Sequence, residues 1–119
     1  MLLVAVFCTA ALILTSCTKV THSTIVGEWE VLYKSIGFDE AETVIYDSWQ
    51  IQFFNDNTYV STNNSEIDKK GYWSYDSSCQ ELTMNNKTFT ADKMEGKVLR
   101  LISIEGIYSN YYLKKVSDL

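Results

Sequence analysis

The sequence contains no proline, a single histidine and three cysteines, and it has no glycine-rich phosphate loop. These shortages leave little material for a metal site, for a nucleophile with its base or for a nucleotide cradle. Positive charge is also scarce, because ten Lys and Arg residues stand against fifteen Asp and Glu residues. Phosphates are neutralised by clustered Lys and Arg, so nucleic acid is not expected as a partner. We therefore expect a protein that is not an enzyme and that has no catalytic residue, metal or cofactor.

The N-terminal residues have the character of a targeting segment. From Met1 to Leu14 the chain carries no charge, and this apolar run is too short to cross a bilayer core of about 30 Å comfortably. Such a run is typical of the hydrophobic region of a signal peptide, the alternatives being a buried core helix and an ordinary secretory peptide. It ends in Leu14, Thr15, Ser16 and Cys17, which together resemble the lipobox of bacterial lipoproteins.

The lipobox resemblance implies that the chain is cut before Cys17 and that Cys17 receives lipid, so that the anchor alone contacts the membrane. Each buried acyl methylene contributes about 0.8 kcal/mol, which suffices to hold a protein at a membrane without a spanning helix. Thr18 is compatible with delivery to the outer membrane of a Gram-negative bacterium, facing the periplasm. We expect residues 1–16 to be a lipoprotein signal peptide, residues 17–24 to be a lipidated tether with a solvated His22, and residues 25–119 to be the folded domain.

The folded part is predicted to be all-β. Hydrophobic residues make up 46% of the chain, and from Gly27 onward they recur with a period of two between short turns. Trp29, Val31 and Tyr33 show this alternation most clearly. We expect about eight antiparallel strands at residues 27–34, 49–53, 59–62, 71–75, 81–84, 87–91, 98–104 and 107–116.

Short links between these strands favour an up-and-down order, in which consecutive strands are neighbours. Eight strands are enough to close a sheet into a small β-barrel, and closure removes the edges that proline often protects. A two-sheet β-sandwich is the alternative. The long interruption from Ile36 to Ser48 is expected to be a solvated acidic loop pinned by Phe38 and Ile45, or a flap over the mouth of the barrel.

Four segments of the domain, taken in order, resemble the lipocalin-like domain of small bacterial lipoproteins. They are Ile25 to Trp29, Trp49 to Tyr59, Gly71 to Tyr75, and Tyr111 to Lys115. The resemblance implies that the tryptophan of the Gly-x-Trp segment, Trp29, plugs the closed end of the barrel. It also implies that a basic residue of the last strand, Lys114 or Lys115, lies above that ring as a cation.

Two functions remain open for such a barrel. A binding protein for a small apolar or amphipathic ligand would surround a cavity with inward-facing side chains, for which the candidates are Phe53, Trp73, Tyr75, Met84, Leu99 and Leu101. The alternative is a filled barrel that acts as an envelope accessory module and contacts a protein or glycan through exposed Tyr72, Tyr108 and Tyr111. A solvent-connected void above about 300 Å³ would favour binding.

Cys79 is the one cysteine left once Cys8 is removed with the signal peptide and Cys17 is lipidated. A lone cysteine forms no internal disulfide. We expect Cys79 to be a small, half-buried turn residue rather than a reactive thiol.

Overall fold

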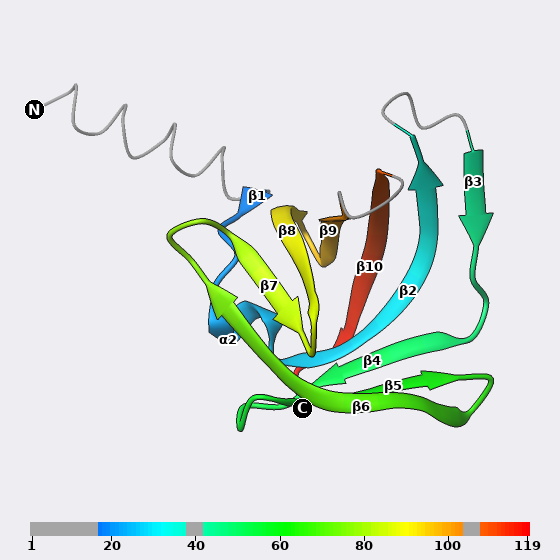
Figure 1. Ribbon diagram of the computed structural model, residues 1–119, viewed down its shortest axis with the longest axis horizontal. Helices are drawn as coiled ribbons and strands as arrows, with labels where there is room; N and C mark the ends of the chain where they lie inside the picture. Colours follow the sequence, from blue (N-terminus) through cyan, green and yellow to red (C-terminus); the bar gives the residue numbers. More distant parts are fainter. Residues whose placement is uncertain (1–16, 38–41, 104–107) are drawn as a thin grey trace, which may run out of the picture.

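The computed structural model describes residues 17–37, 42–103 and 108–119. Within them the chain forms strands almost throughout, with one short helix (Figure 1). The elements are β1 (Cys17–Thr18), α2 (His22–Ile25), β2 (Gly27–Ile36), β3 (Glu42–Ile45), β4 (Trp49–Phe53), β5 (Thr58–Asn63), β6 (Glu66–Asp76), β7 (Glu81–Met84), β8 (Lys87–Glu95), β9 (Val98–Ser103) and β10 (Ser109–Ser117). The predicted signal peptide and lipobox, residues 1–16, lie outside the described residues. In the described part of the chain, no helix is both long and apolar enough to span a membrane.

Eight of the described strands close into an antiparallel up-and-down barrel. The order around the ring is β2, β4, β5, β6, β7, β8, β9 and β10, and the pairing of β10 with β2 completes it. That last ladder runs from Ser109 opposite Ile36 to Ser117 opposite Glu28. In Figure 1, β4, β5 and β6 form one wall of the ring, and β2, β10, β9 and β8 rise above them. The predicted barrel is confirmed, and the sandwich is not formed.

Two strands extend the sheet outside the ring. β3 pairs with the second half of β2, from Tyr33 opposite Ile45 to Ile36 opposite Glu42, because β4 pairs only with the first half of β2. The segment from Ile36 to Ser48 is therefore not simply a loop, and Ile45, which is 80% exposed, does not pin it. Thr43, Val44 and Ile45 are β-branched and favour an extended chain, which satisfies backbone groups of β2 that β4 leaves unpaired. Phe38 lies outside the described residues.

The segment before the barrel packs against it instead of forming a solvated tether. Cys17 and Thr18 pair with the end of β8, opposite Glu95 and Met94, and the side chain of Val20 is buried. Thr21 then caps α2, since its side-chain oxygen accepts a hydrogen bond from the Thr24 N–H and the Thr24 side chain accepts one from the Thr21 N–H.

The expectation of a solvated His22 is also wrong. Its ring stacks on Trp73, with 4.6 Å between the ring centroids. Ile25, at the end of α2, is completely buried. Val20, before this four-residue helix, and Ile25, its last residue, help to seat the segment over one end of the barrel, because burial removes their apolar surface from water.

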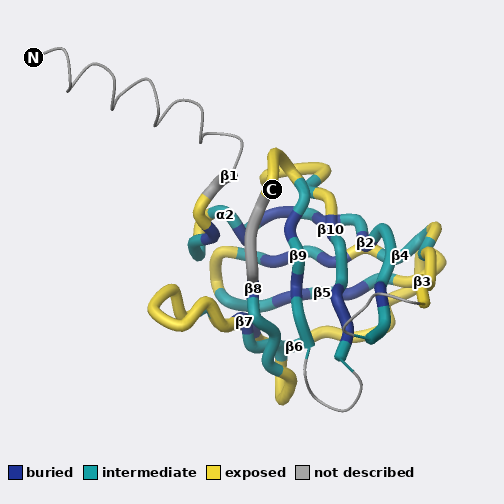
Figure 2. The backbone as a smooth tube through the Cα atoms, turned by 90° about the horizontal axis from the view of Figure 1, so that it is seen from above, coloured by how far each residue is buried: buried dark blue, intermediate teal, exposed yellow. Residues whose placement is uncertain are grey.

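The core fills that end of the barrel. Its largest fully buried side chains are Trp29, Phe53, Ile25, Leu82, Leu99, Leu113 and Val31. Figure 2 shows the buried positions along the barrel strands, while the exposed positions gather at the turns, on β3 and along much of β6. We call the end that carries α2 and the Trp29 side chain the closed end.

The Trp29 side chain occupies the closed end as the resemblance implied. Its indole N–H donates a hydrogen bond to the Ile25 carbonyl at 2.8 Å. The Nζ of Lys115 lies 5.6 Å from the centroid of the Trp29 ring and donates to the Thr24 carbonyl at 3.0 Å. Lys114, the other residue considered for this position, is exposed.

Candidate ligand cavity

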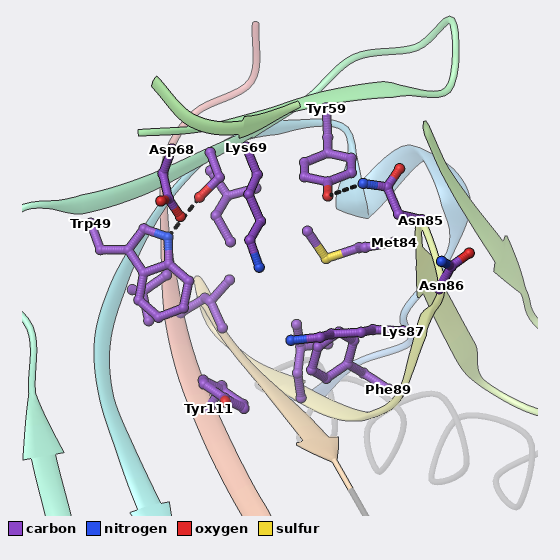
Figure 3. Close-up of a pocket in the computed structure, with 15 residues that line it drawn as sticks. Trp49, Tyr59, Asp68, Lys69, Met84, Asn85, Asn86, Lys87, Phe89 and Tyr111 are labelled. Carbon is purple, nitrogen blue, oxygen red and sulfur yellow. Dashed lines mark hydrogen bonds between the residues drawn. The ribbon is translucent and has the colours of Figure 1, made fainter. Parts of the chain in front are cut away.

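A cavity of about 320 Å³ lies inside the barrel at the other end from the tryptophan plug. All eight strands of the ring contribute to its wall, as expected for the interior of a closed barrel (Figure 3). Its lining residues are Val31, Trp49, Ile51, Tyr59, Ser61, Asp68, Lys69, Met84, Asn85, Asn86, Lys87, Phe89, Leu101, Tyr111 and Leu113. Asp68, Lys69, Asn85, Asn86 and Lys87 are exposed, so these residues form the mouth through which the cavity meets solvent.

The deeper wall is aromatic and aliphatic. Trp49 packs edge-on against Tyr46 and Tyr111, with centroid distances of 4.9 and 6.2 Å, and Phe89 packs edge-on against Tyr111 at 5.9 Å. The indole N–H of Trp49 donates to the Ser61 hydroxyl at 2.8 Å, so this buried donor does not need a partner inside the cavity. The wall therefore presents mainly apolar surface.

Two phenols of the wall stay neutral at ordinary pH. Burial raises the pKa of Tyr111, and burial together with the nearby Asp68 charge raises the pKa of Tyr59. The Tyr59 hydroxyl accepts a hydrogen bond from the Asn85 amide at 3.0 Å and retains its own proton to donate. The interior thus contains a hydroxyl donor beside its apolar surface.

Asn85 fixes the position of the β7–β8 turn at the mouth. Besides its bond to Tyr59, its side-chain oxygen accepts from the Tyr72 N–H at 3.1 Å. The same side chain packs against Gly71 so closely that a Cβ there would overlap it. Asn85 itself has a positive φ of 54°, a conformation that asparagine tolerates better than most residues. One turn residue thereby ties together β5, β6 and the turn.

A β-bulge in β6 shapes the opposite side of the mouth. Ser61 of β5 lies opposite Lys69, and the next residue, Thr62, lies opposite Ile67, so Asp68 has no partner on β5. A bulge interrupts the alternation of side chains along a strand. Consecutive residues Asp68 and Lys69 therefore both line the cavity. Neither residue was predicted from the sequence, because four of the five residues 66–70 are charged and the segment lacks the period-two signal of a strand.

The cavity residues predicted from the sequence are correct in part. Met84 and Leu101 line the cavity. Phe53, Trp73 and Leu99 do not, because they are buried in the core of the closed end.

Tyr75 also lies away from the cavity and packs, half-buried, against that same core. The alternation of a strand predicts which residues face inward, but not whether an inward position lies in the filled or the hollow part of a barrel. The position of each residue along the barrel axis decides whether it joins the core or the cavity, and this position was not predicted for Phe53, Trp73, Tyr75 and Leu99.

The aromatic surface proposed as an alternative is not assembled in the structure. Tyr72 is 73% exposed, but Tyr111 lines the cavity. Tyr108 is half-buried, and its carbonyl accepts a hydrogen bond from the Gly37 N–H at 2.8 Å.

Cys79 is exposed rather than half-buried, since it lies in the turn between β6 and β7. Its thiol donates a hydrogen bond to the Glu81 carboxylate at 3.0 Å. This bond, then desolvation and the neighbouring Asp76, raise the pKa of the Cys79 thiol to about 11, which disfavours the reactive thiolate. Among residues 17–37, 42–103 and 108–119, no three His, Cys, Asp or Glu side chains gather in a group that could hold a metal ion.

No protein-family model, curated protein or solved structure matches this chain.

Proposed function

We propose that this protein holds a small apolar or amphipathic molecule inside its barrel. The observation that carries the proposal is the cavity of about 320 Å³, whose wall includes Trp49, Phe89 and Leu101 and whose mouth is polar. Binding sites for small molecules are typically concave, mainly apolar and supplied with a few placed polar groups. Their volumes start at about 300 Å³, so this cavity suits a small ligand.

We further propose that the barrel is anchored in the cell envelope by lipid on Cys17. The support is the order of the segments, an uncharged apolar run followed by Leu14, Thr15, Ser16 and Cys17. We also propose that the chain belongs to the lipocalin-like family of small bacterial lipoproteins, on the strength of the sequence resemblance. Membership of that family agrees with a lipid anchor on Cys17. The anchor would place the protein at the outer membrane of a Gram-negative bacterium, on the periplasmic side.

The binding proposal is tested with N-phenyl-1-naphthylamine, a neutral fluorophore that brightens in apolar surroundings. We expect saturable binding of one probe per chain. Leu101→Trp adds bulk inside the cavity and should abolish the binding, because little free volume remains. Tyr72→Trp adds a tryptophan at a position that is 73% exposed and should leave binding unchanged.

A folded protein that gives no saturable signal would overturn the binding proposal in favour of the accessory module. Equal binding by Leu101→Trp would also overturn it, since the probe would then lie elsewhere. Circular dichroism in the near ultraviolet checks that each variant keeps its tertiary packing.

The anchor proposal is tested by growing cells with an alkyne-tagged fatty acid and comparing the natural chain with Cys17→Ser. We expect label on the natural chain and its loss in the variant, with the protein moving from the membrane to the soluble fraction. Cys79→Ser is the matched control and should keep both the label and the membrane location. Label that survives Cys17→Ser would contradict the proposal.

A further inference from the structure

Two lysines approach the mouth of the cavity from different strands. Lys69 belongs to β6 and Lys87 is the first residue of β8. Figure 3 shows both side chains extending into the opening, with their ammonium groups pointing into the same space. Neither ammonium group forms an ion pair or a hydrogen bond with any of the described residues. This is notable in a chain with five more acidic than basic residues, where carboxylate partners are plentiful.

The charge of the mouth is positive. Lys69, Lys87 and Asp68 are the charged residues among those that line the cavity, which gives two positive charges against one negative charge. The walls beneath them are apolar, and a charge at the edge of such a wall attracts an opposite charge more strongly than it would in open water. The site therefore favours a ligand with a negative head and an apolar body.

Regular pairing with β5 places Lys69 at the mouth, because Lys69 lies opposite Ser61, which lines the cavity. The bulge at Asp68 interrupts the alternation and adds that carboxylate to the lining beside Lys69. The next residue, Lys70, does not line it. Lys70 therefore offers a neighbouring lysine on the same strand that is not part of the mouth.

Building on the proposed function, we propose that the ligand is a single-chain amphiphile with a carboxylate head. The head lies between the ammonium groups of Lys69 and Lys87, and the chain lies along the wall that includes Trp49 and Phe89. The Tyr59 hydroxyl, which keeps its proton, supplies a further donor inside the cavity. A carboxylate carries one charge and matches the net charge of the mouth, whereas a phosphate monoester carries about −1.5 to −2.

The test measures how well three amphiphiles of equal chain length displace N-phenyl-1-naphthylamine from the full chain, each below its critical micelle concentration. They are decanoate, 1-decanol and decyltrimethylammonium. We expect decanoate to displace the probe at a concentration about tenfold lower than decanol does, because hydrogen bonds to a charged group add to the same apolar contact. Decyltrimethylammonium should be the weakest of the three.

Lys69→Gln and Lys87→Gln should each weaken displacement by decanoate several-fold more than they change displacement by decanol or the affinity for the probe. Lys70→Gln is the matched control and should leave displacement of the probe by decanoate and by decanol unchanged. Added salt should weaken displacement of the probe by decanoate but not by decanol, because salt screens exposed charges.

The outcomes separate this inference from the function on which it rests. If decanol competes as well as decanoate, or if Lys70→Gln has the same effect as Lys69→Gln, the anionic head is wrong while the binding cavity stands. If the probe itself fails to bind the folded natural chain, both the cavity function and this inference fall together.

Discussion

The Nζ of Lys115 stands 5.6 Å from the centroid of the Trp29 ring, and it also donates a hydrogen bond to the Thr24 carbonyl at 3.0 Å. The ring belongs to the first strand of the barrel and the lysine to the last, while Thr24 belongs to the segment that packs beneath them. One side chain therefore connects the seam where the barrel closes with the segment that covers its end. The contribution of these two contacts of Lys115 to the stability of the closed end can be measured by substitution.

Replacing Lys115 by Met should destabilise the protein by about 1–2 kcal/mol, because the cation over the ring and its hydrogen bond are lost while the apolar stem is kept. Urea unfolding gives the change in the free energy of unfolding. Lys114→Met is the control, and its effect should stay within about 0.5 kcal/mol because Lys114 is exposed. Equal costs for the two variants would contradict a specific role for Lys115.

Replacing Gly71 by Ala should destabilise the barrel by about 1–3 kcal/mol, because the new methyl group overlaps the Asn85 side chain. The double variant Gly71→Ala with Asn85→Gly should cost less than the sum of its single variants, since the second change removes the overlap. Urea unfolding of the four proteins measures this coupling. Additive costs would show that the two residues do not compete for space.

Gly96→Ala is a control for the comparison of these four proteins. Nothing lies within 4 Å of a Cβ at Gly96, but its φ is +59°, so the cost should be about 1 kcal/mol of backbone strain. That cost should not change when Asn85 is replaced by Gly.

His22→Ala should lower the free energy of unfolding by about 0.5–1.5 kcal/mol, because the stacking contact with Trp73 is lost. His22→Phe keeps an aromatic ring at this position and should recover most of that stability. Thermal unfolding followed by circular dichroism compares the three proteins. If His22→Phe were as unstable as His22→Ala, stacking would not be the reason for the loss.

The Cys79 thiol should react slowly with iodoacetamide at pH 8, although it is exposed. Its pKa of about 11 leaves very little thiolate at that pH. Glu81→Gln removes the charged acceptor that favours the protonated thiol, so the pKa should fall toward its ordinary value and the rate at pH 8 should rise about tenfold. In both proteins the rate should rise with pH and level off above the thiol pKa, at a lower pH in the variant.

Alkylation followed by mass spectrometry gives these rates. Glu66→Gln removes an exposed carboxylate from the other end of β6 and should leave the rate unchanged. Fast alkylation of the natural protein at pH 8 would contradict the raised pKa.

The barrel could be predicted from the sequence because its strands follow a local rule. Trp29 and Val31, or Ile51 and Phe53, alternate with polar residues, and the strands from β4 to β9 are joined by short turns rich in Asn, Asp, Ser or Gly. Asp56 illustrates the turns, since its carboxylate accepts hydrogen bonds from Thr58 and the pKa of Asp56 is lowered as a result. Such local signals need no knowledge of distant contacts.

The cavity could not be predicted in the same way. Whether Leu99 or Leu101 meets the hollow space depends on how far along the barrel axis each lies, and this follows from the register between strands rather than from either residue. The bulge at Asp68 is likewise a property of the β5–β6 pair. The packing of residues 17–24 was not predicted, because a short, mainly polar segment reveals little about the surface that receives it.

The single unpaired residue in β6 also bears on how this interior could change over time. Deleting one codon at Asp68 would restore uninterrupted pairing with β5, because Lys69 would stay opposite Ser61 and Ile67 opposite Thr62, and it would remove the one carboxylate from the mouth of the cavity. The barrel could thus acquire a different selectivity through one small genetic event while its architecture stayed the same.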